Sequence, residues 1–108
     1  MNKKVIAVDI GASSGKMAFG EFDGSQLLVR EYRDFANRPV DIGTALYWDV
    51  FSLHNAIVDG MAYFKEKYGE ADVVAVDTWG ASYGLLDKKG RLMEPVYHYR
   101  DERTRTTI

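Results

Sequence analysis

The sequence contains no cysteine, only two prolines and no apolar run long enough to span a bilayer. Without cysteine the chain cannot form disulfides or thiolate metal sites, and it fits a reducing compartment. The amino terminus lacks the hydrophobic segment of a secretion signal. Fourteen basic and sixteen acidic residues give a net charge of −2 with no basic block. The sequence therefore lacks the basic patch typical of proteins that bind nucleic acid or anionic membranes. These absences predict a cytoplasmic globular protein with no nucleic-acid or membrane partner.

The stretch from Val5 to Lys16, VIAVDIGASSGK, is the strongest local signal. It predicts a buried apolar strand that ends in Asp9, followed by a glycine-rich turn from Gly11 to Gly15. Glycine permits tight backbone conformations there. The serines, Lys16 and the N–H groups of the turn could donate to a phosphate, and Asp9 could hold a cation through water. The alternative interpretation is an ordinary hairpin turn that contains serines.

This turn is not a P-loop. A P-loop has four residues between its glycines and a Ser or Thr after the lysine. Here three residues separate Gly11 from Gly15, and Met17 follows Lys16. The turn also leads into a predicted strand, so no helix N-terminus is available to the phosphates. The sequence therefore predicts a phosphate-binding site formed by a hairpin turn.

Three strands joined by short turns open the chain, and we expect them to form an antiparallel meander. They are predicted at 4–9, 16–22 and 27–35, with the hairpin signal Asp23-Gly24 between the last two. Residues 37–46 have little periodicity and are predicted to form a loop.

A helix follows the loop, with Asp49 or Ser52 as its N-cap and Gly69 as its C-terminal stop. Gly60 interrupts good helix formers, which indicates close packing against a neighbour. Apolar residues at spacings of three and four define one face: Leu53, Ile57, Met61, Phe64 and Tyr68.

A second apolar strand is predicted at 72–77, and we expect it to be buried and parallel to the first strand. A turn at 87–90 then leads to a short strand at 92–97, which Pro95 limits to an edge. The last residues, 100–108, resemble the start of a helix. The order βββαβ predicts the α/β core with a mixed sheet that ribonuclease H, actin and sugar kinases share.

Asp9 and Asp77 end the two strands predicted to be parallel, so both should emerge at the carboxyl edge where ligands bind in open α/β sheets. Two carboxylates suit a divalent metal or a polar substrate; alternatively each caps the turn that follows it. Trp79-Gly80 lies just beyond the second strand. The indole could form a wall for a sugar, or it could be a buried anchor.

The remaining polar candidates are less specific. The helix residue His54 is expected to be packed or solvated, and His98 has no partner spacing for a metal. A dense aromatic and charged cluster near the end could line a polyol pocket or form a surface ion-pair face: Tyr97, Tyr99, Arg100, Asp101 and Arg103.

Four motifs together resemble the FGGY family of carbohydrate kinases, and within it most closely the rhamnulokinases. They are IAVDIGASSGK, YWDV, VDTWG and YHYRDERT, and they extend over almost the whole chain. Two departures from the family pattern stand out: Lys16 replaces the usual arginine, and Ala81-Ser82 replaces Val-Asp.

The resemblance implies ATP-dependent phosphorylation of a ketose, L-rhamnulose, to its 1-phosphate. It implies that Gly80, beside Trp79, contacts the sugar and that Asp9 positions Mg²⁺. It places the ATP phosphates at five consecutive residues: Ala12, Ser13, Ser14, Gly15 and Lys16.

The family's general base and its adenosine site lie later than residue 108. The resemblance therefore implies that residues 1–108 are the amino-terminal part of the first kinase domain, a single partial domain without a catalytic residue. We expect the isolated chain to be inactive, and its uncovered apolar edge could drive self-association.

Three other functions remain open. Another FGGY kinase would act on xylulose, ribulose, fuculose or glycerol. A ribonuclease H-like nuclease would need a helix acid facing the metals, and Asp59 and Glu66 lie past the start of the helix. A non-catalytic actin-like ATPase module would share the turn but has no evident need for Trp79-Gly80.

Overall fold

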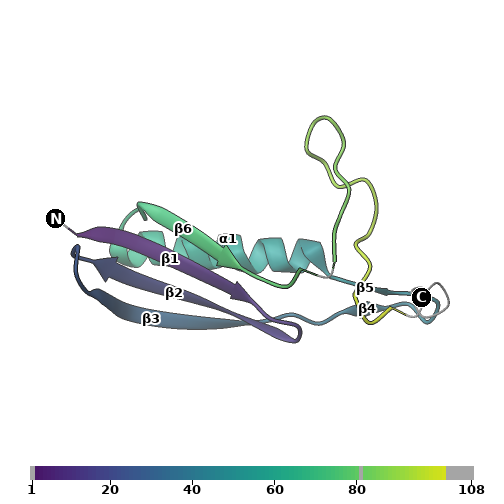
Figure 1. Cartoon of the computed structure of the whole chain (residues 1–108), viewed down its shortest axis with the longest axis horizontal. Coiled ribbons are helices and arrows are strands. Elements are labelled where there is room, and N and C mark those ends of the chain that lie inside the picture. Colours follow the sequence, from purple (N-terminus) through teal and green to yellow (C-terminus); the bar gives the residue numbers. More distant parts are fainter. Residues whose placement is uncertain (1, 81, 102–108) are drawn as a thin grey trace.

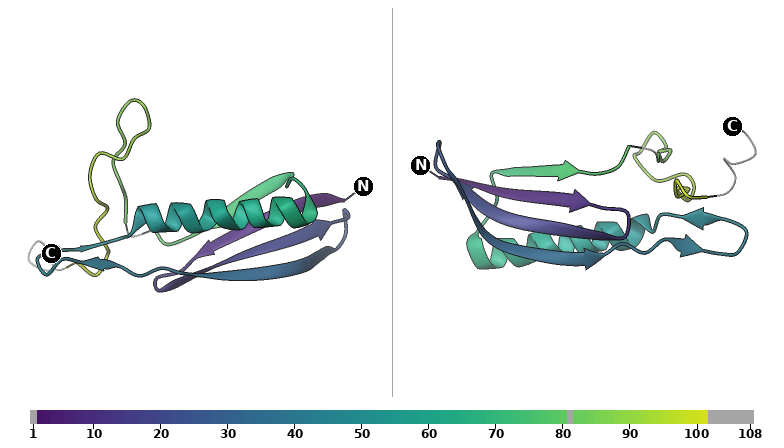
Figure 2. Two further views of the ribbon diagram at one scale, coloured as in Figure 1. Left: turned by 180° about the vertical axis from the view of Figure 1, so that it is seen from behind. Right: turned by 60° about the horizontal axis from the view of Figure 1, so that its bottom comes forward.

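The computed structural model describes residues 2–80 and 82–101, and its core is a four-stranded sheet with one helix packed on one face (Figures 1 and 2). The strand order is β3-β2-β1-β6, with the first three strands antiparallel and β6 parallel to β1. The five elements are β1 (Lys3–Ile10), β2 (Ser14–Phe22), β3 (Leu27–Ala36), α1 (Val50–Tyr68) and β6 (Val73–Asp77). The predicted βββαβ core with a mixed sheet is confirmed.

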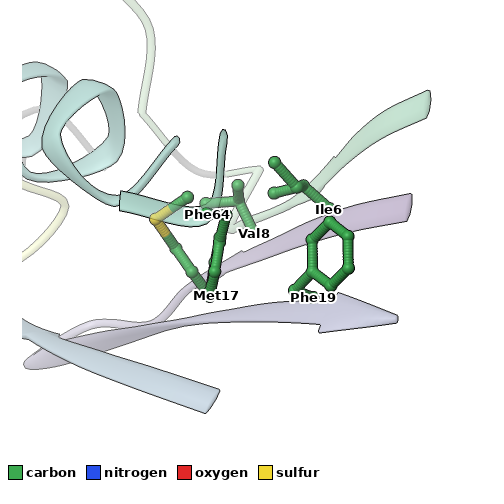
Figure 3. Close-up of a cluster of buried hydrophobic side chains, with 5 residues drawn as sticks. All are labelled: Ile6, Val8, Met17, Phe19 and Phe64. Atoms are coloured by element: carbon green, nitrogen blue, oxygen red, sulfur yellow. The ribbon is translucent and has the colours of Figure 1, made fainter. Parts of the chain in front are cut away.

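The core lies between the sheet and α1 (Figure 3). Alternate residues of β1 and β2 point toward the helix, as a pleated strand requires. Phe19 is fully buried and its ring stacks on Tyr68 at 4.3 Å between centroids. Met17 fills the space that a Cβ on Gly60 would need, which confirms the predicted close packing at this glycine. The buried cluster is Ile6, Val8, Met17, Phe19 and Phe64.

The helix begins and ends where the sequence predicts. Asp49 caps it, because its carboxylate accepts a hydrogen bond from the Ser52 N–H at 3.2 Å and from the Ser52 hydroxyl at 2.7 Å. Gly69 has φ of 90° and donates its N–H to the Lys65 carbonyl at 2.8 Å. His54 is exposed on the outer side of the helix.

Glu31 ties β3 to the helix. Its carboxylate accepts hydrogen bonds from the Lys67 ammonium at 2.7 Å, the Tyr63 hydroxyl at 2.5 Å and the Tyr68 hydroxyl at 2.8 Å. These donors, with Lys67 foremost, lower the pKa of Glu31 to about 2. The carboxylate therefore stays ionised and joins the two layers at the end away from the predicted phosphate turn.

The prediction that the second parallel strand is buried is wrong. All five residues of β6 are exposed, including Val76 at 58%. The reason is its place in the sheet: β6 is an edge strand, and within residues 2–80 and 82–101 no strand pairs with its outer side. β1 is likewise buried only on the helix side, since Ile6 and Val8 are covered and Ala7 is exposed.

The loop predicted at 37–46 contains a short hairpin, β4 (Val40–Asp41) with β5 (Leu46–Tyr47). This hairpin extends beyond the carboxyl ends of β1 and β6 (Figure 1). Its pairing depends on long-range contacts, since Asp101 and segment 96–98 hold β5 from the far side.

The strand predicted at 92–97 does not form. Only single bridges occur, Leu86 with Leu92 and Tyr47 with Tyr97, and Pro95 has no N–H to extend a ladder. Most of the helix start predicted at 100–108 lies outside the described residues. No helix in the described part of the chain is long and apolar enough to cross a membrane.

Candidate functional site

Asp9 and Asp77 lie side by side at the carboxyl ends of the parallel strands β1 and β6. The register pairs these two residues directly, as it pairs Val8 with Val76 before them. Neighbouring strands are about 4.8 Å apart, so the two carboxylates share one small region. Both are exposed. The predicted meeting of the two aspartates at this edge is confirmed.

A row of four charged residues crosses the sheet at this point. Register places Asp34 of β3 opposite Lys16 of β2, Lys16 opposite Asp9, and Asp9 opposite Asp77. Paired positions project to the same face, and their neighbours Val8 and Met17 are buried against the helix. The four charges therefore belong to the opposite face of the sheet, and Lys16 stands between two carboxylates.

The turn from Gly11 to Ser14 joins β1 to β2, and the Gly11 N–H closes it by donating to the Ser14 carbonyl at 2.9 Å. Neither Gly11 nor Gly15 has a positive φ, so backbone freedom is not why glycine stands there. A Cβ on Gly11 would lie 2.8 Å from the Ser14 carbonyl oxygen, and the ring of Phe35 fills the space beside Gly15. The glycines are required by space.

A hollow of about 410 Å³ opens beside the turn. The Lys16 ammonium makes no ion pair or hydrogen bond with any described residue, and the Tyr32 ring centroid lies 5.2 Å from it. The hydroxyls of Ser13 and Ser14 are likewise unused within the described part of the chain, and both residues are exposed. Residues Asp9, Gly11, Ser14, Gly15, Lys16 and Asp34 line the hollow. Its unused donors suit an anion such as phosphate.

The donor set at this edge fits Mg²⁺ bound together with a phosphate. Mg²⁺ is usually held by one or two carboxylates plus substrate phosphates and water. Asp9 and Asp77 supply two carboxylates, and no group of three metal-binding side chains occurs among the described residues. Asp59 and Glu66 of α1 do not form such a group with Asp9 and Asp77 in the described part of the chain, so the structure does not place there the helix acid that a nuclease would need.

A second cluster forms around Trp48, beyond the end of the sheet. Trp79 stacks on Trp48 with centroids 3.7 Å apart and planes 9° apart, and the Trp48 indole N–H donates to the Ser82 hydroxyl at 2.8 Å. Trp48 is buried, whereas Trp79 is only half-buried. One face of Trp79 is thus packed. Gly80 is exposed, with open space where a side chain would begin.

His98 is buried in the same cluster, with its ring 4.0 Å from Trp48 between centroids. Its Nδ1 accepts a hydrogen bond from the Arg100 N–H at 3.1 Å, so the neutral ring carries its proton on Nε2. Burial, helped by the charge of Arg100, lowers the pKa of His98. The neutral, packed form of this histidine is therefore favoured.

The predicted cluster at 97–103 is only partly brought together. Asp101 is buried and its carboxylate accepts the Leu46 N–H at 2.7 Å, so it holds the β4–β5 hairpin. Arg100 is exposed, with its guanidinium 5.3 Å from the Tyr99 ring centroid. Arg103 lies outside the described residues.

A more spacious hollow, about 510 Å³, is apolar and lies between the β4–β5 hairpin, the start of α1 and segment 92–96. None of residues 11–16 line it. Because binding a phosphate requires N–H and cationic donors, the smaller polar hollow is the better candidate for chemistry.

Sequence reasoning missed three residues near these clusters: Asp34, Asn37 and Trp48. The alternation of side chains along β3 places Asp34 on the same face of the sheet as Tyr32. This pattern could have identified Asp34 from the sequence. No local signal marks Asn37, whose side-chain partner Gly11 lies 26 residues away in the turn.

No protein-family model matches the chain. Curated relatives do match: it is 35% identical over 104 residues to the rhamnulokinase of Bacteroides thetaiotaomicron and 37% identical over 102 residues to that of Bacillus subtilis. These alignments cover 96% and 94% of this chain. This chain is homologous to the rhamnulokinases. It spans about a fifth (21%) of the length of both relatives.

Solved structures show the same fold. A gluconate kinase from Lactobacillus acidophilus matches with a TM-score of 0.78 and 12% identity, over 99% of this chain and 22% of that one. A ligand-bound xylulose kinase from the same organism matches with a TM-score of 0.79 and 13% identity, over 97% and 21%. The expected actin-like fold of the sugar kinases is confirmed.

Proposed function

We propose that this chain forms the phosphate-binding part of an ATP-dependent sugar kinase that converts L-rhamnulose to L-rhamnulose 1-phosphate. The observation that supports this most is the polar hollow at the carboxyl edge, which is lined by Asp9, Ser14 and Lys16. Asp77 pairs with Asp9 at the same edge of the sheet. The similarity to rhamnulokinases of two organisms supports L-rhamnulose as the sugar.

In this proposal the ATP phosphates bind at Ala12–Lys16. The N–H groups of the turn, the Ser13 and Ser14 hydroxyls and the Lys16 ammonium offset the negative charge that phosphoryl transfer concentrates on the phosphate oxygens. Asp9 holds Mg²⁺, with Asp77 beside it, and the bound ion would neutralise part of the phosphate charge.

The sugar would contact Gly80, where open space lets a ligand approach the backbone, and the face of Trp79 that does not stack on Trp48. No described residue is assigned as the base that takes the hydroxyl proton. We therefore propose that residues 1–108 are part of the first domain of a two-domain cytoplasmic kinase, and that this chain alone transfers no phosphate.

Phosphate binding is testable on the chain itself, because 108 residues suit amide-resolved NMR. Titration with MgATP, and separately with Mg-triphosphate, should shift the amides of Gly11 to Lys16 before any others. In Lys16→Ala the affinity should fall, whereas Lys89→Ala, which removes an exposed lysine from a distant turn, should leave it unchanged. Equal shifts throughout the chain, or none near the turn, would contradict the proposal.

Activity and sugar choice need the rest of a kinase. We suggest grafting residues 1–104 onto the remaining four fifths of the Bacteroides thetaiotaomicron rhamnulokinase and measuring ADP release. L-rhamnulose should be preferred over xylulose, ribulose, fuculose and glycerol, with the unmodified relative as the control. Preference for another sugar would favour the alternative of a different FGGY kinase. The ungrafted chain should release no ADP above background.

The exposed edge of β6 supports a further proposal, that the isolated chain self-associates. Val73, Val74 and Val76 are all more than 40% exposed on an unpaired strand. Light scattering at high concentration should show dimers or larger species, and Val76→Lys should reduce them. A strictly monomeric wild-type chain would rule this out.

A further inference from the structure

Asn37 directly follows β3 and donates hydrogen bonds to two carbonyls of the phosphate turn. Its side-chain Nδ2 donates to the Gly11 carbonyl at 2.6 Å, and its main-chain N–H donates to the Ser13 carbonyl at 3.3 Å. The residue is only 2% exposed. A single buried residue thus connects the first residue of the turn with its third.

The preceding residues of β3 hold the other side of the turn. Ala36 pairs with Ser14 and Phe35 pairs with Gly15, and the Phe35 ring packs into the space where Gly15 has no side chain. The end of β3 and Asn37 therefore form a brace, which we define as residues 35–37, along the whole length of the turn.

Packing alone does not explain an asparagine at this position. Its Oδ1 is buried and has no hydrogen-bond partner among the described residues. A buried polar atom without a partner is destabilising, and a leucine of similar size would avoid that cost. The feature that leucine could not supply is the bond from Nδ2 to the Gly11 carbonyl.

We propose that Asn37 is the positioning residue of the phosphate turn: it fixes the Gly11 carbonyl and so preorganises the N–H groups that bind phosphate. This rests on the proposed function for its ligand. N–H groups contribute most to anion binding when they are already in place, because no conformational freedom is then lost on binding. Asn37 itself would touch neither the phosphate nor the sugar.

The test compares Asn37→Leu with Asn55→Leu, the same change at an exposed asparagine on α1. Two quantities are measured by NMR on the 108-residue chain: the Kd for Mg-triphosphate, and the hydrogen-exchange rate of the Gly11 amide relative to the Val8 amide in the core. Losing one hydrogen bond to a held carbonyl should change each about tenfold in Asn37→Leu. Asn55→Leu should change neither.

A purely structural role predicts a different pattern. In that case the thermal midpoint of Asn37→Leu would shift while the Kd and the relative exchange rate of Gly11 stayed as in the wild type, and the proposal would be overturned. If the wild type bound no triphosphate, the proposed function would fail, yet the Gly11 exchange ratio would still decide whether Asn37 holds the turn. Should Asn37→Leu not fold, Asn37→Ser, which is smaller, gives the same two readouts.

Discussion

Gly15→Ala tests whether space, not backbone conformation, dictates glycine in the turn. Gly15 is buried and has no positive φ, so an alanine can adopt its backbone conformation without strain. The added Cβ would nevertheless overlap three atoms at the far end of the Phe35 ring, including Cε1 at 2.7 Å. Carbon atoms in contact normally stand about 3.5–4.0 Å apart, so the ring would have to retreat by about 1 Å or more.

The expected cost follows from two opposing effects. Overpacking of this kind costs about 1–3 kcal/mol. Replacing glycine at a compatible backbone position stabilises the protein by about 0.4–1 kcal/mol, because it restricts the unfolded chain. We therefore expect Gly15→Ala to lower the free energy of unfolding by about 1–2 kcal/mol, measured by urea denaturation and followed by circular dichroism.

Phe35→Leu provides the matched background, because leucine ends at Cδ and lacks the ring atoms that would overlap the new Cβ. In that background Gly15→Ala should cost less than about 0.5 kcal/mol, so the two substitutions are coupled by about 1 kcal/mol or more. If Gly15→Ala is equally costly with and without the Phe35 ring, or stabilises the wild type, the steric explanation is refuted.

Three further predictions concern stability and pH. Glu31 has a folded pKa of about 2, below its ordinary value of 4.5, so its contribution to stability is present above about pH 4.5 and lost as pH falls toward 2. Glu31→Gln should therefore lower the urea midpoint at pH 7 and flatten the decline of that midpoint between pH 4.5 and 2. An unchanged decline would contradict this. Burial lowers the pKa of His98, so the contribution of its neutral form to stability is present above pH 6.5 and lost below. His98→Gln should remove the corresponding part of the pH dependence of the thermal midpoint. Gly60→Ala should destabilise by about 1–2 kcal/mol in urea, because overpacking against buried Met17 exceeds the helix-propensity gain of about 1 kcal/mol, and Met17→Val should relieve it.

The elements with a strong local period were predictable from sequence. The spacing from Leu53 to Tyr68 gave the helix, and Asp49 and Gly69 gave its ends, because caps satisfy backbone groups locally. The apolar runs before Asp9 and Asp77 gave two strands, and the intervening helix required them to be parallel. Position at the carboxyl edge then followed for both aspartates.

Features that depend on contacts across the chain were not predictable. The burial of β6 depends on its neighbours in the sheet, and its composition alone suggested the wrong answer. Asn37 reaches the turn through a bond that spans 26 positions, and Trp48 meets Trp79 across 31 positions. The β4–β5 hairpin has strands of only two residues, too short for any period to show.

If the turn binds a polyphosphate as proposed, it does so without a helix N-terminus. A P-loop relies partly on the positive end of a helix dipole, which this strand–turn–strand arrangement lacks. Lys16 is the single cation in a row with three aspartates, Asp34, Asp9 and Asp77, so the edge alone is negative on balance. A bare triphosphate would meet that charge with only Lys16, two hydroxyls and the N–H groups in its favour. A divalent cation held by Asp9 and Asp77 would reverse the balance, because both carboxylate and phosphate charges attract it. In the proposed kinase the nucleotide should therefore bind as its magnesium complex, with the brace behind the turn supplying the rigidity that a helix supplies elsewhere.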